Sequence, residues 1–182
     1  MSRASAPKAN LTNMLEKYSN LQEYLANCGA KNTAERIRAF LDYHLIDAGD
    51  GAHWESPLIK ALQVTRTDDN VCEFEFTVKP EMCNPFGTLH GGCATTILDL
   101  LSSAVVLTVP GPEGDMTTAA VSKNIMISFL RPVMVGQTVK VVIKIVMELG
   151  AHSSYTGCIS TMDGKVCVSF AHDKHSMLKG KM

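Results

Sequence analysis

The feature that most constrains the fold is a loop of small residues that continues directly into a long helical pattern. The loop reads Asn84-Pro-Phe-Gly-Thr-Leu-His-Gly-Gly92, and apolar residues at helical spacing follow from Cys93. The pattern predicts a helix of about 18 residues, because Pro110-Gly-Pro-Glu-Gly114 cannot continue it. This is the one long helix that the sequence indicates after residue 57, so the neighbouring strands must pack against it.

Strand patterns lie on both sides of this helix. Cys72, Phe74, Phe76 and Val78 alternate with polar residues, which is the period of a strand with one buried face. The same alternation predicts a hairpin before the helix and four strands after it, at residues 58–66 and 71–79, then at about 117–130, 138–149, 153–161 and 165–173. We therefore expect an α+β fold in which one antiparallel sheet wraps around a central helix.

The outer face of this sheet also needs cover. Branched apolar residues of the 138–149 strand lie on one face, while Val142 and Val146 share the other face with Lys140 and Lys144. A partner subunit is the expected cover for those apolar side chains.

Two amphipathic helices precede the sheet. Apolar residues recur at helical spacing from Leu11 to a stop at Gly29. A second pattern starts at Asn32, with Glu35 in a capping-box position, and ends at Gly49.

These patterns divide the chain into two predicted parts. We predict an N-terminal helical extension over residues 1–53 and a second domain over residues 54–182. Trp54, the only tryptophan, is expected to anchor the start of the second domain onto the main body.

Composition argues against two classes of partner. The 182 residues include 17 Lys plus Arg and 18 Asp plus Glu, and no stretch is densely basic, so we expect no nucleic acid. The longest apolar runs, such as Val139 to Met147, are shorter than a membrane span, so we expect no membrane-spanning segment.

Six scattered cysteines without a C-x-x-C pair predict free thiols and a cytoplasmic location. The residues before Glu16 include Arg3 and Lys8 but no Asp or Glu, as in a mitochondrial presequence, so a mitochondrial location is the alternative.

Two groups on the predicted central helix could act on a substrate. The first amides of a helix have no intrahelical partner, so Gly91 and Gly92 can present N–H groups to a negatively charged oxygen. Asp99 lies on a small polar face of the same helix, about 12 Å further along the axis from Gly91 at the usual helical rise. If both groups act on one substrate, they must come from two subunits related by a two-fold axis.

Each of these residues also has a purely structural explanation. Asp99 could be a solvated residue of the polar face, and His90 could be a helix-start residue packed under the loop. Asn84 before Pro85 could be a turn former. The combination of an amide side chain, a His-Gly-Gly helix start and an acid on the small face favours a functional site.

The pattern Asn84-x-x-Gly-Thr-Leu-His-Gly-Gly92, followed after six residues by Asp99, resembles the signature of the hotdog-fold thioesterases. It is most similar to the branch of phenylacetic-acid-type enzymes and thioesterase superfamily member 2 (acyl-CoA thioesterase 13). The resemblance extends from about Trp54 to His175 and implies a hotdog fold, with dimers joined through their sheets that often pair into homotetramers. The helical extension is longer than the family usually carries.

The resemblance also implies a role for each polar residue. The Gly91 amide would polarise the thioester carbonyl, and Asn84 would place the carbonyl or the water. Asp99 from the neighbouring subunit would activate the water or attack, with Ser122 assisting the water and His90 supporting the site. Four further positions correspond to segments that contact coenzyme A in the relatives: Arg131, Gly150, His152 and His175.

The expected reaction needs no metal, and coenzyme A enters only as part of the substrate. His172 and His175 would lie on opposite faces of a strand, which is poor geometry for one ion. We expect an acyl-CoA thioesterase of fatty acid metabolism that releases a free acid and coenzyme A, with the acyl chain left open. The alternatives are a hotdog enoyl-CoA hydratase or dehydratase that uses His90, and a non-catalytic acyl-CoA-binding protein.

Overall fold

The computed structural model describes residues 11–46, 53–109, 120–149 and 151–176. The elements follow in the order α1 (Leu11–Asn27), α2 (Thr33–Ile46), α3 (Ser56–Ala61), β1 (Gln63–Asp68), β2 (Val71–Thr77), η1 (Pro80–Met82), α4 (Gly91–Ala104), η2 (Val105–Thr108), β3 (Ala120–Phe129), β4 (Thr138–Leu149), β5 (His152–Thr161) and β6 (Val166–Ser176). The predicted helix stop at 110–114 and the predicted site residue Gly150 lie outside the described residues.

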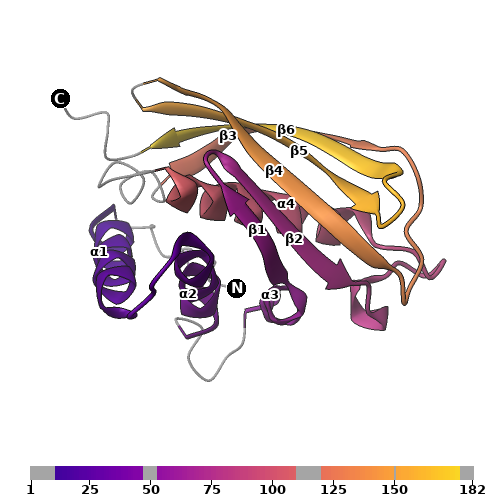
Figure 1. Ribbon diagram of the computed structural model, residues 1–182, viewed down its shortest axis with the longest axis horizontal. Helices are drawn as coiled ribbons and strands as arrows, with labels where there is room; N and C mark the ends of the chain where they lie inside the picture. The colour runs from indigo at the N-terminus through magenta and orange to yellow at the C-terminus, as the bar shows by residue number, and fades with distance from the viewer. Residues whose placement is uncertain (1–10, 47–52, 110–119, 150, 177–182) are drawn as a thin grey trace, which may run out of the picture.

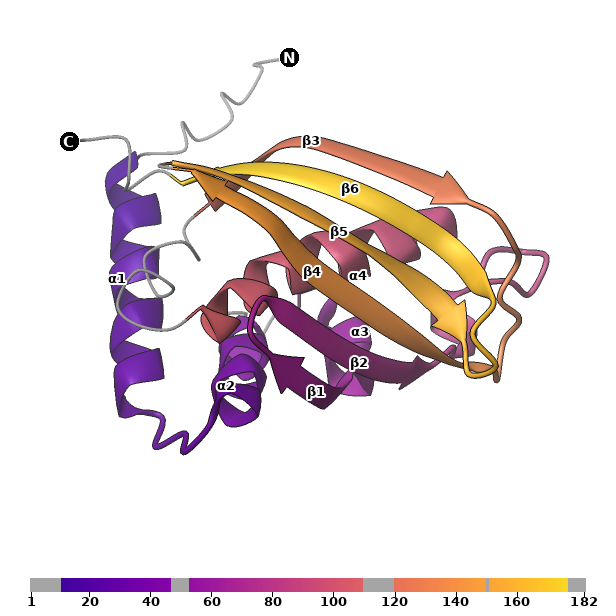
Figure 2. The same cartoon turned by 45° about the horizontal axis from the view of Figure 1, so that its top comes forward.

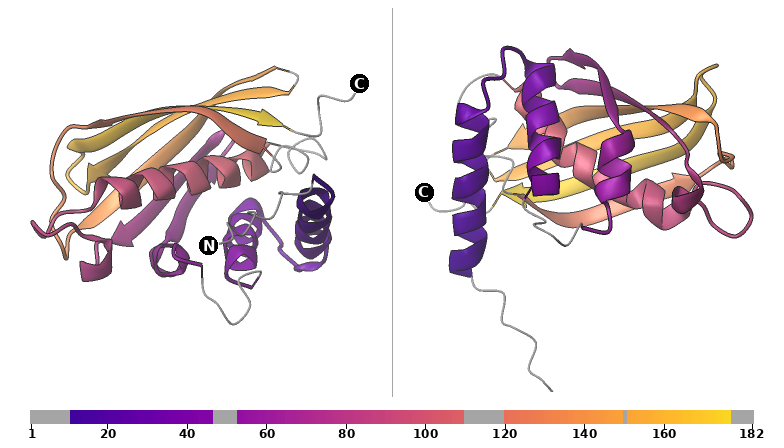
Figure 3. Two further views of the ribbon diagram at one scale, coloured as in Figure 1. Left: turned by 180° about the vertical axis from the view of Figure 1, so that it is seen from behind. Right: turned by 90° about the horizontal axis from the view of Figure 1, so that it is seen from below.

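The six strands form one antiparallel sheet in the order β1-β2-β4-β5-β6-β3. The sheet curves around α4, which lies along its concave face (Figures 1 and 2). Seen from behind, the length of α4 lies against the sheet, and α1 and α2 stand beside its C-terminal end (Figure 3). The predicted α+β architecture, one antiparallel sheet around a central helix, is confirmed.

An apolar stripe on α4 holds the helix against the sheet. Its residues, each at most 1% exposed, are Ala94, Ile97, Leu98 and Leu101 of α4, continued by Val105 at the start of η2. Buried branched residues of β4 cover the stripe from the sheet side. Because burying one large apolar side chain contributes roughly 1.5–3 kcal/mol, this packing fixes where the two ends of α4 lie.

The opposite face of α4 is less open than the sequence indicated. Ser102 and Val106, predicted on a face free for another backbone, are both fully buried within the chain.

The stretch Gly91–Thr108 is long and apolar enough to cross a membrane, although no such stretch was expected from the apolar runs of the sequence. Most of it is buried inside the protein, which is the usual situation of a central core helix.

Helix α2 belongs to the same core. Asn32 Oδ1 accepts a hydrogen bond from Glu35 N at 2.9 Å, which confirms the predicted start of this helix. Ile37 and Phe40 of α2 are buried together with the apolar residues of α4. Helix α1 packs on α2 (Figure 1). The proposed boundary between residues 53 and 54 stays a prediction.

One predicted strand begins later than expected. Residues 58–61, predicted as the start of a strand, belong to α3, and β1 begins only at Gln63. Pro57 lies in the first turn of α3. Proline is tolerated there because the N–H that it lacks would have no intrahelical partner.

Candidate active site

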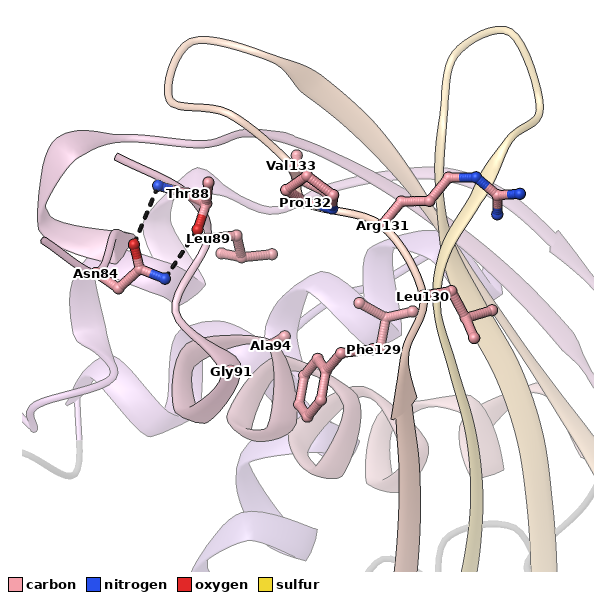
Figure 4. A pocket seen from close by; sticks show the side chains of 11 residues that line it. Asn84, Thr88, Leu89, Gly91, Ala94, Phe129, Leu130, Arg131, Pro132 and Val133 are labelled. Atoms are coloured by element: carbon pink, nitrogen blue, oxygen red, sulfur yellow. Dashed lines mark hydrogen bonds between the residues drawn. The ribbon is translucent and has the colours of Figure 1, made fainter. Parts of the chain in front are cut away.

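Asn84 fastens the loop that precedes α4. Its Oδ1 accepts hydrogen bonds from Phe86 N at 3.0 Å and Thr88 N at 3.3 Å, and its Nδ2 donates to Thr88 Oγ1 at 2.8 Å. Figure 4 shows the two bonds to Thr88. Gly87 supplies the positive φ of 73° within this turn. Asn84 therefore has the turn-forming role, and its action on a carbonyl or a water stays a prediction.

His90 caps the start of α4. Its Nδ1 accepts a hydrogen bond from Gly92 N at 2.9 Å, so the Gly92 amide is already used inside the chain. The expectation that both glycine amides face a substrate is therefore wrong for Gly92. Within the described part of the chain, the Gly91 amide donates no hydrogen bond. Gly91 alone can offer its N–H to an incoming oxygen.

The Gly91 amide lies at a cavity of about 310 Å³, which we call the Gly91 cavity (Figure 4). Its lining residues are Asn84, Thr88, Leu89, Gly91, Ala94, Phe129, Leu130, Arg131, Pro132, Val133 and Val168. A Cβ at position 91 would lie 3.2 Å from Phe129 Cζ, so glycine allows the end of β3 to approach the helix start. The walls are mainly apolar, and the backbone N–H is the group suited to a carbonyl oxygen.

Asp99 lines a second cavity of about 400 Å³, which we call the Asp99 cavity. Its lining residues are His44, Trp54, Glu55, Thr95, Thr96, Asp99, Leu100, Ser103, Ala120, Ser122 and Lys174. It shares no lining residue with the Gly91 cavity. Trp54, predicted as an anchor, instead lies at this cavity with 70% of its surface exposed. Buried side chains of α3 hold the start of the domain in its place.

The Asp99 carboxylate is held by two side chains. Ser122 Oγ donates to Asp99 Oδ1 at 3.0 Å, and Lys174 Nζ lies 3.2 Å from the same oxygen. Burial raises the pKa of the Asp99 carboxyl, but the charge and hydrogen bond of Lys174, aided by Ser122, bring that pKa below its ordinary value. Asp99 is therefore ionised at neutral pH, and the structure places Ser122 beside it.

The register of two strands brings these side chains to Asp99. Ser122 of β3 lies directly opposite Lys174 of β6, so both project from the same face of the sheet toward α4. Ile125 then pairs with His172, which means that β3 contains one extra residue, a bulge around Lys123. The bulge allows Ser122 and Ile125 to face the helix although they are three residues apart.

His172 is the second β6 residue beneath Asp99. Its ring is 1% exposed, Nδ1 lies 2.9 Å from Ser102 Oγ, and Nε2 lies 3.6 Å from Asp99 Oδ1. Burial, with a smaller contribution from the charge of Lys174, lowers the pKa of His172 to about 4. The ring is therefore neutral at pH 7 and does not form an ion pair with Asp99.

The four predicted coenzyme A positions do not lie together in one chain. His152 and His175 are register partners whose rings lie 4.8 Å apart at one end of the sheet. Arg131 lies at the other end, where Nη1 donates to Val166 O, and its guanidinium points away from Gly91 (Figure 4). Gly150 lies outside the described residues. A single chain thus separates Arg131 from the two histidines.

Lys174 and His172 received no site role from the sequence. A signal was available, because Phe170, His172 and Lys174 recur with a period of two on a strand and so share one face. A lysine on the inward face of a strand needs an acidic partner. Within the described ranges, no three His, Cys, Asp or Glu side chains lie close enough to hold a metal ion.

Comparison with solved structures shows the fold. Thioesterase superfamily member 2 from zebrafish is 18% identical with a TM-score of 0.69, and the match covers 80% of this chain and 99% of that chain. The E. coli PaaI protein from the phenylacetic acid degradation operon is 16% identical with a TM-score of 0.58, covering 90% and 98%. A hypothetical thioesterase protein with coenzyme A from Streptococcus pneumoniae is 15% identical with a TM-score of 0.56, covering 64% and 88%.

Comparison of sequences adds a match to one family model over part of the chain. A search of curated proteins finds no match. A family model, the Thioesterase superfamily, matches residues 86–167, which include the helix start, Asp99 and Ser122. The chain therefore has the hotdog fold, and its residues 86–167 match the thioesterase superfamily model.

Proposed function

We propose that the protein is an acyl-CoA thioesterase that hydrolyses an acyl-CoA thioester to a free acid and coenzyme A. The observation that carries the proposal is an ionised carboxylate, Asp99, held at a cavity by Ser122 and Lys174. The superfamily match supports a thioester substrate, and the Streptococcus pneumoniae structure with coenzyme A supports coenzyme A as its carrier.

Two copies of the chain would complete the site. β3 is an edge strand, and Phe129 near its end lies at the Gly91 cavity while Ser122 near its start lies at the Asp99 cavity. Antiparallel pairing of β3 with the β3 of a second copy would place the Gly91 cavity of one subunit beside the Asp99 cavity of its partner. Met126, midway between them, is 64% exposed, which supports a covered edge in the assembly. We propose a homodimer, which two dimers can extend to a homotetramer.

The same pairing would reunite the coenzyme A positions. Arg131 of one subunit would approach the end of the partner's sheet that carries His152 and His175. Arg131 of one subunit and the two histidines of its partner could then bind one coenzyme A molecule from both sides. We also propose a cytoplasmic location, which the six free cysteines support.

The proposed chemistry uses the two cavities for different tasks. The Gly91 N–H would donate to the thioester carbonyl oxygen, where negative charge develops during attack. Asp99 of the partner would take a proton from water as the water oxygen attacks the carbonyl carbon. The carbon–sulfur bond then breaks, and the proton passes from Asp99 to the departing thiolate. Direct attack by Asp99, through an anhydride that water then hydrolyses, is the other route open to this carboxylate.

Thiol release from a panel of acyl-CoAs tests the proposal. The panel contains short, medium and long aliphatic chains and aromatic acyl groups, offered to wild type, Asp99→Asn and Ser122→Ala. Asp163→Asn is the control, because Asp163 is an exposed carboxylate that pairs with Lys165 on a hairpin. We expect the wild type and the control to release thiol and Asp99→Asn to be inactive.

Two results would contradict the proposal. Undiminished thiol release by Asp99→Asn would remove the proposed mechanism. Tight coenzyme A binding without release from any acyl-CoA would support the non-catalytic alternative instead. No observation favours the hydratase alternative, because the ring nitrogen Nδ1 of His90 is already used to cap α4.

A further inference from the structure

Lys174 is a buried lysine whose ammonium group is fully used by α4. The residue is 3% exposed. Its Nζ lies 3.2 Å from Asp99 Oδ1, donates to the main-chain oxygen of Asp99 at 3.1 Å, and donates to Ser103 Oγ. An ammonium has three N–H donors, so these three acceptors match its capacity. Lys174 thus contacts both the carboxylate and the main-chain oxygen of Asp99.

Burying the Lys174 ammonium costs free energy, so the need to fill space does not explain why a lysine occupies this position. Moving an ammonium out of water costs several kcal/mol unless a partner compensates it, and an apolar side chain could fill the same inward position. Phe170, four residues earlier on the same face of β6, is such an apolar side chain. The charge at position 174 therefore points to its acidic partner, Asp99.

The side chains that contact the Asp99 carboxylate all face the same one of its two oxygens. Ser122 Oγ, Lys174 Nζ and the more distant His172 Nε2 all face Oδ1. Within the described part of the chain, Asp99 Oδ2 makes no hydrogen bond or ion pair. Asp99 is nevertheless 49% exposed at its side chain, at the edge of the Asp99 cavity. Oδ1 is therefore held by neighbouring side chains, whereas Oδ2 is left open toward the cavity.

We propose that Lys174 is the positioning residue of the thioesterase site: it anchors Oδ1 of Asp99 so that Oδ2 is the oxygen that meets the water or the thioester. The inference rests on the proposed function and deepens it. Lys174 itself does not touch the reacting atoms, so its removal should impair the chemical step far more than substrate binding.

The charges around Asp99 make the effect of Lys174 on pH dependence predictable. From β6, His172 is neutral at pH 7, because its pKa is about 4. From the helical extension and the segment before α3, His44 and Glu55 line the same cavity. Lys174 is the cation in direct contact with the carboxylate, and its charge lowers the Asp99 pKa. Removing that charge leaves the burial of Asp99, which raises its pKa.

The test compares Lys174→Met with Lys140→Met as a matched control. Lys140 also pairs with a carboxylate, that of Glu73, but on β4 and β2, away from both cavities. We measure kcat and KM across pH with the acyl-CoA that wild type cleaves fastest. We expect Lys174→Met to lower kcat by up to about 100-fold, the scale of a misplaced reacting group, with KM nearly unchanged. The acidic limb of its kcat profile should move to higher pH, and Lys140→Met should match wild type.

Added alkylamine separates the charge from the fold. In Lys174→Ala, ethylamine can enter the space left by the side chain and restore an ammonium, so we expect it to recover part of kcat while ethanol does not. If Lys174→Met does not fold, Lys174→Gln carries the same comparison, because its amide supplies two N–H donors without the charge. Wild-type kcat and an unmoved acidic limb in the folded variant would overturn the inference.

A measurement without substrate distinguishes this inference from the proposed function. The ¹³C shift of the Asp99 carboxyl, assigned by its loss in Asp99→Asn, reports the pKa of Asp99 directly. We expect that pKa to be higher in Lys174→Met than in wild type, whether or not any acyl-CoA is cleaved. An unchanged pKa would overturn the role of Lys174, whereas failure of the acyl-CoA panel with a raised pKa would overturn only the thioesterase assignment.

Discussion

The Gly91 cavity and the Asp99 cavity lie along the same helix but are built in different ways. In the first, the donor group comes from neighbours in sequence: Asn84, His90 and Gly91 belong to a loop and a helix start held by local hydrogen bonds, and residues 129–133 and Val168 complete the walls. The second is made by residues far apart in sequence, since Lys174 and Asp99 are separated by 75 positions. One offers a neutral donor beside apolar walls, and the other an ionised acid. Neither has what the other supplies, which is why we propose that two copies complete the site.

The largest expected effect comes from disabling one cavity in each of two chains. Asp99→Asn and Gly91→Pro should each lower thiol release at least about 100-fold, because one loses the base and the other the oxyanion donor. A mixed dimer of the two variants, isolated with two affinity tags, retains one complete site of two and should have about half of wild-type activity. If one chain held a whole site, both sites of the mixed dimer would be dead and it would be inactive.

The next effect isolates the Gly91 amide from the space around it. Gly91 is the first residue of α4, where the helix tolerates a proline, and a proline there lacks the N–H. Gly91→Pro should therefore reduce kcat about 100- to 1,000-fold, the usual cost of a lost oxyanion donor. Gly91→Ala is the control, since its Cβ meets the same Phe129 ring but its amide remains. Equal losses in the two variants would show that crowding, rather than the missing donor, is responsible.

The pH dependence of the free energy of unfolding should come from His172 and Asp99. His172 has a pKa of about 4 in the folded chain against an ordinary value of 6.5, so between these pH values only the unfolded chain takes up its proton. Stability should thus fall as pH drops from about 6.5 to about 4, by on the order of 3 kcal/mol. Asp99, whose pKa is lowered, adds a loss only below this window.

Denaturant unfolding at pH 7, 5.5 and 4.5 measures this effect. The control is His172→Gln, which cannot titrate, and the fall in the free energy of unfolding should be smaller in this variant by the contribution of His172. Equal pH dependence in wild type and His172→Gln would show that the buried ring is not the group that responds.

The two cavities also differ in how far sequence could predict them. The loop, the start of α4 and the apolar stripe on that helix follow from local spacing, and the limits of β4 are as expected. The position of Asp99 on the face of α4 opposite the apolar stripe could be predicted from the helical period. The predicted separation of Asp99 from Gly91 agrees with two cavities that share no residue.

Lys174 and His172 could not be placed with the same reasoning. Their contact with Asp99 depends on the order of strands in the sheet, in which β6 lies beside β3, and on a bulge around Lys123. Neither strand order nor a bulge is encoded in a local pattern. The capping role of His90 is a similar case, because a histidine at a helix start can face the helix or the solvent with equal local spacing.

The smallest expected effect concerns the part of the chain before β1, which lines only one of the two cavities. His44 and Trp54 line the Asp99 cavity, and the Gly91 cavity has no lining residue from this part of the chain. Because Trp54 is 70% exposed, Trp54→Ala should change the free energy of unfolding by less than about 0.5 kcal/mol. It should still raise KM for the preferred acyl-CoA severalfold, since an aromatic wall of the cavity is lost. The control is Phe86→Ala, which removes an exposed aromatic that lines neither cavity and should leave KM unchanged. Equal KM values in the two variants would mean that the acyl group is bound without Trp54, and the Asp99 cavity would then hold the water alone.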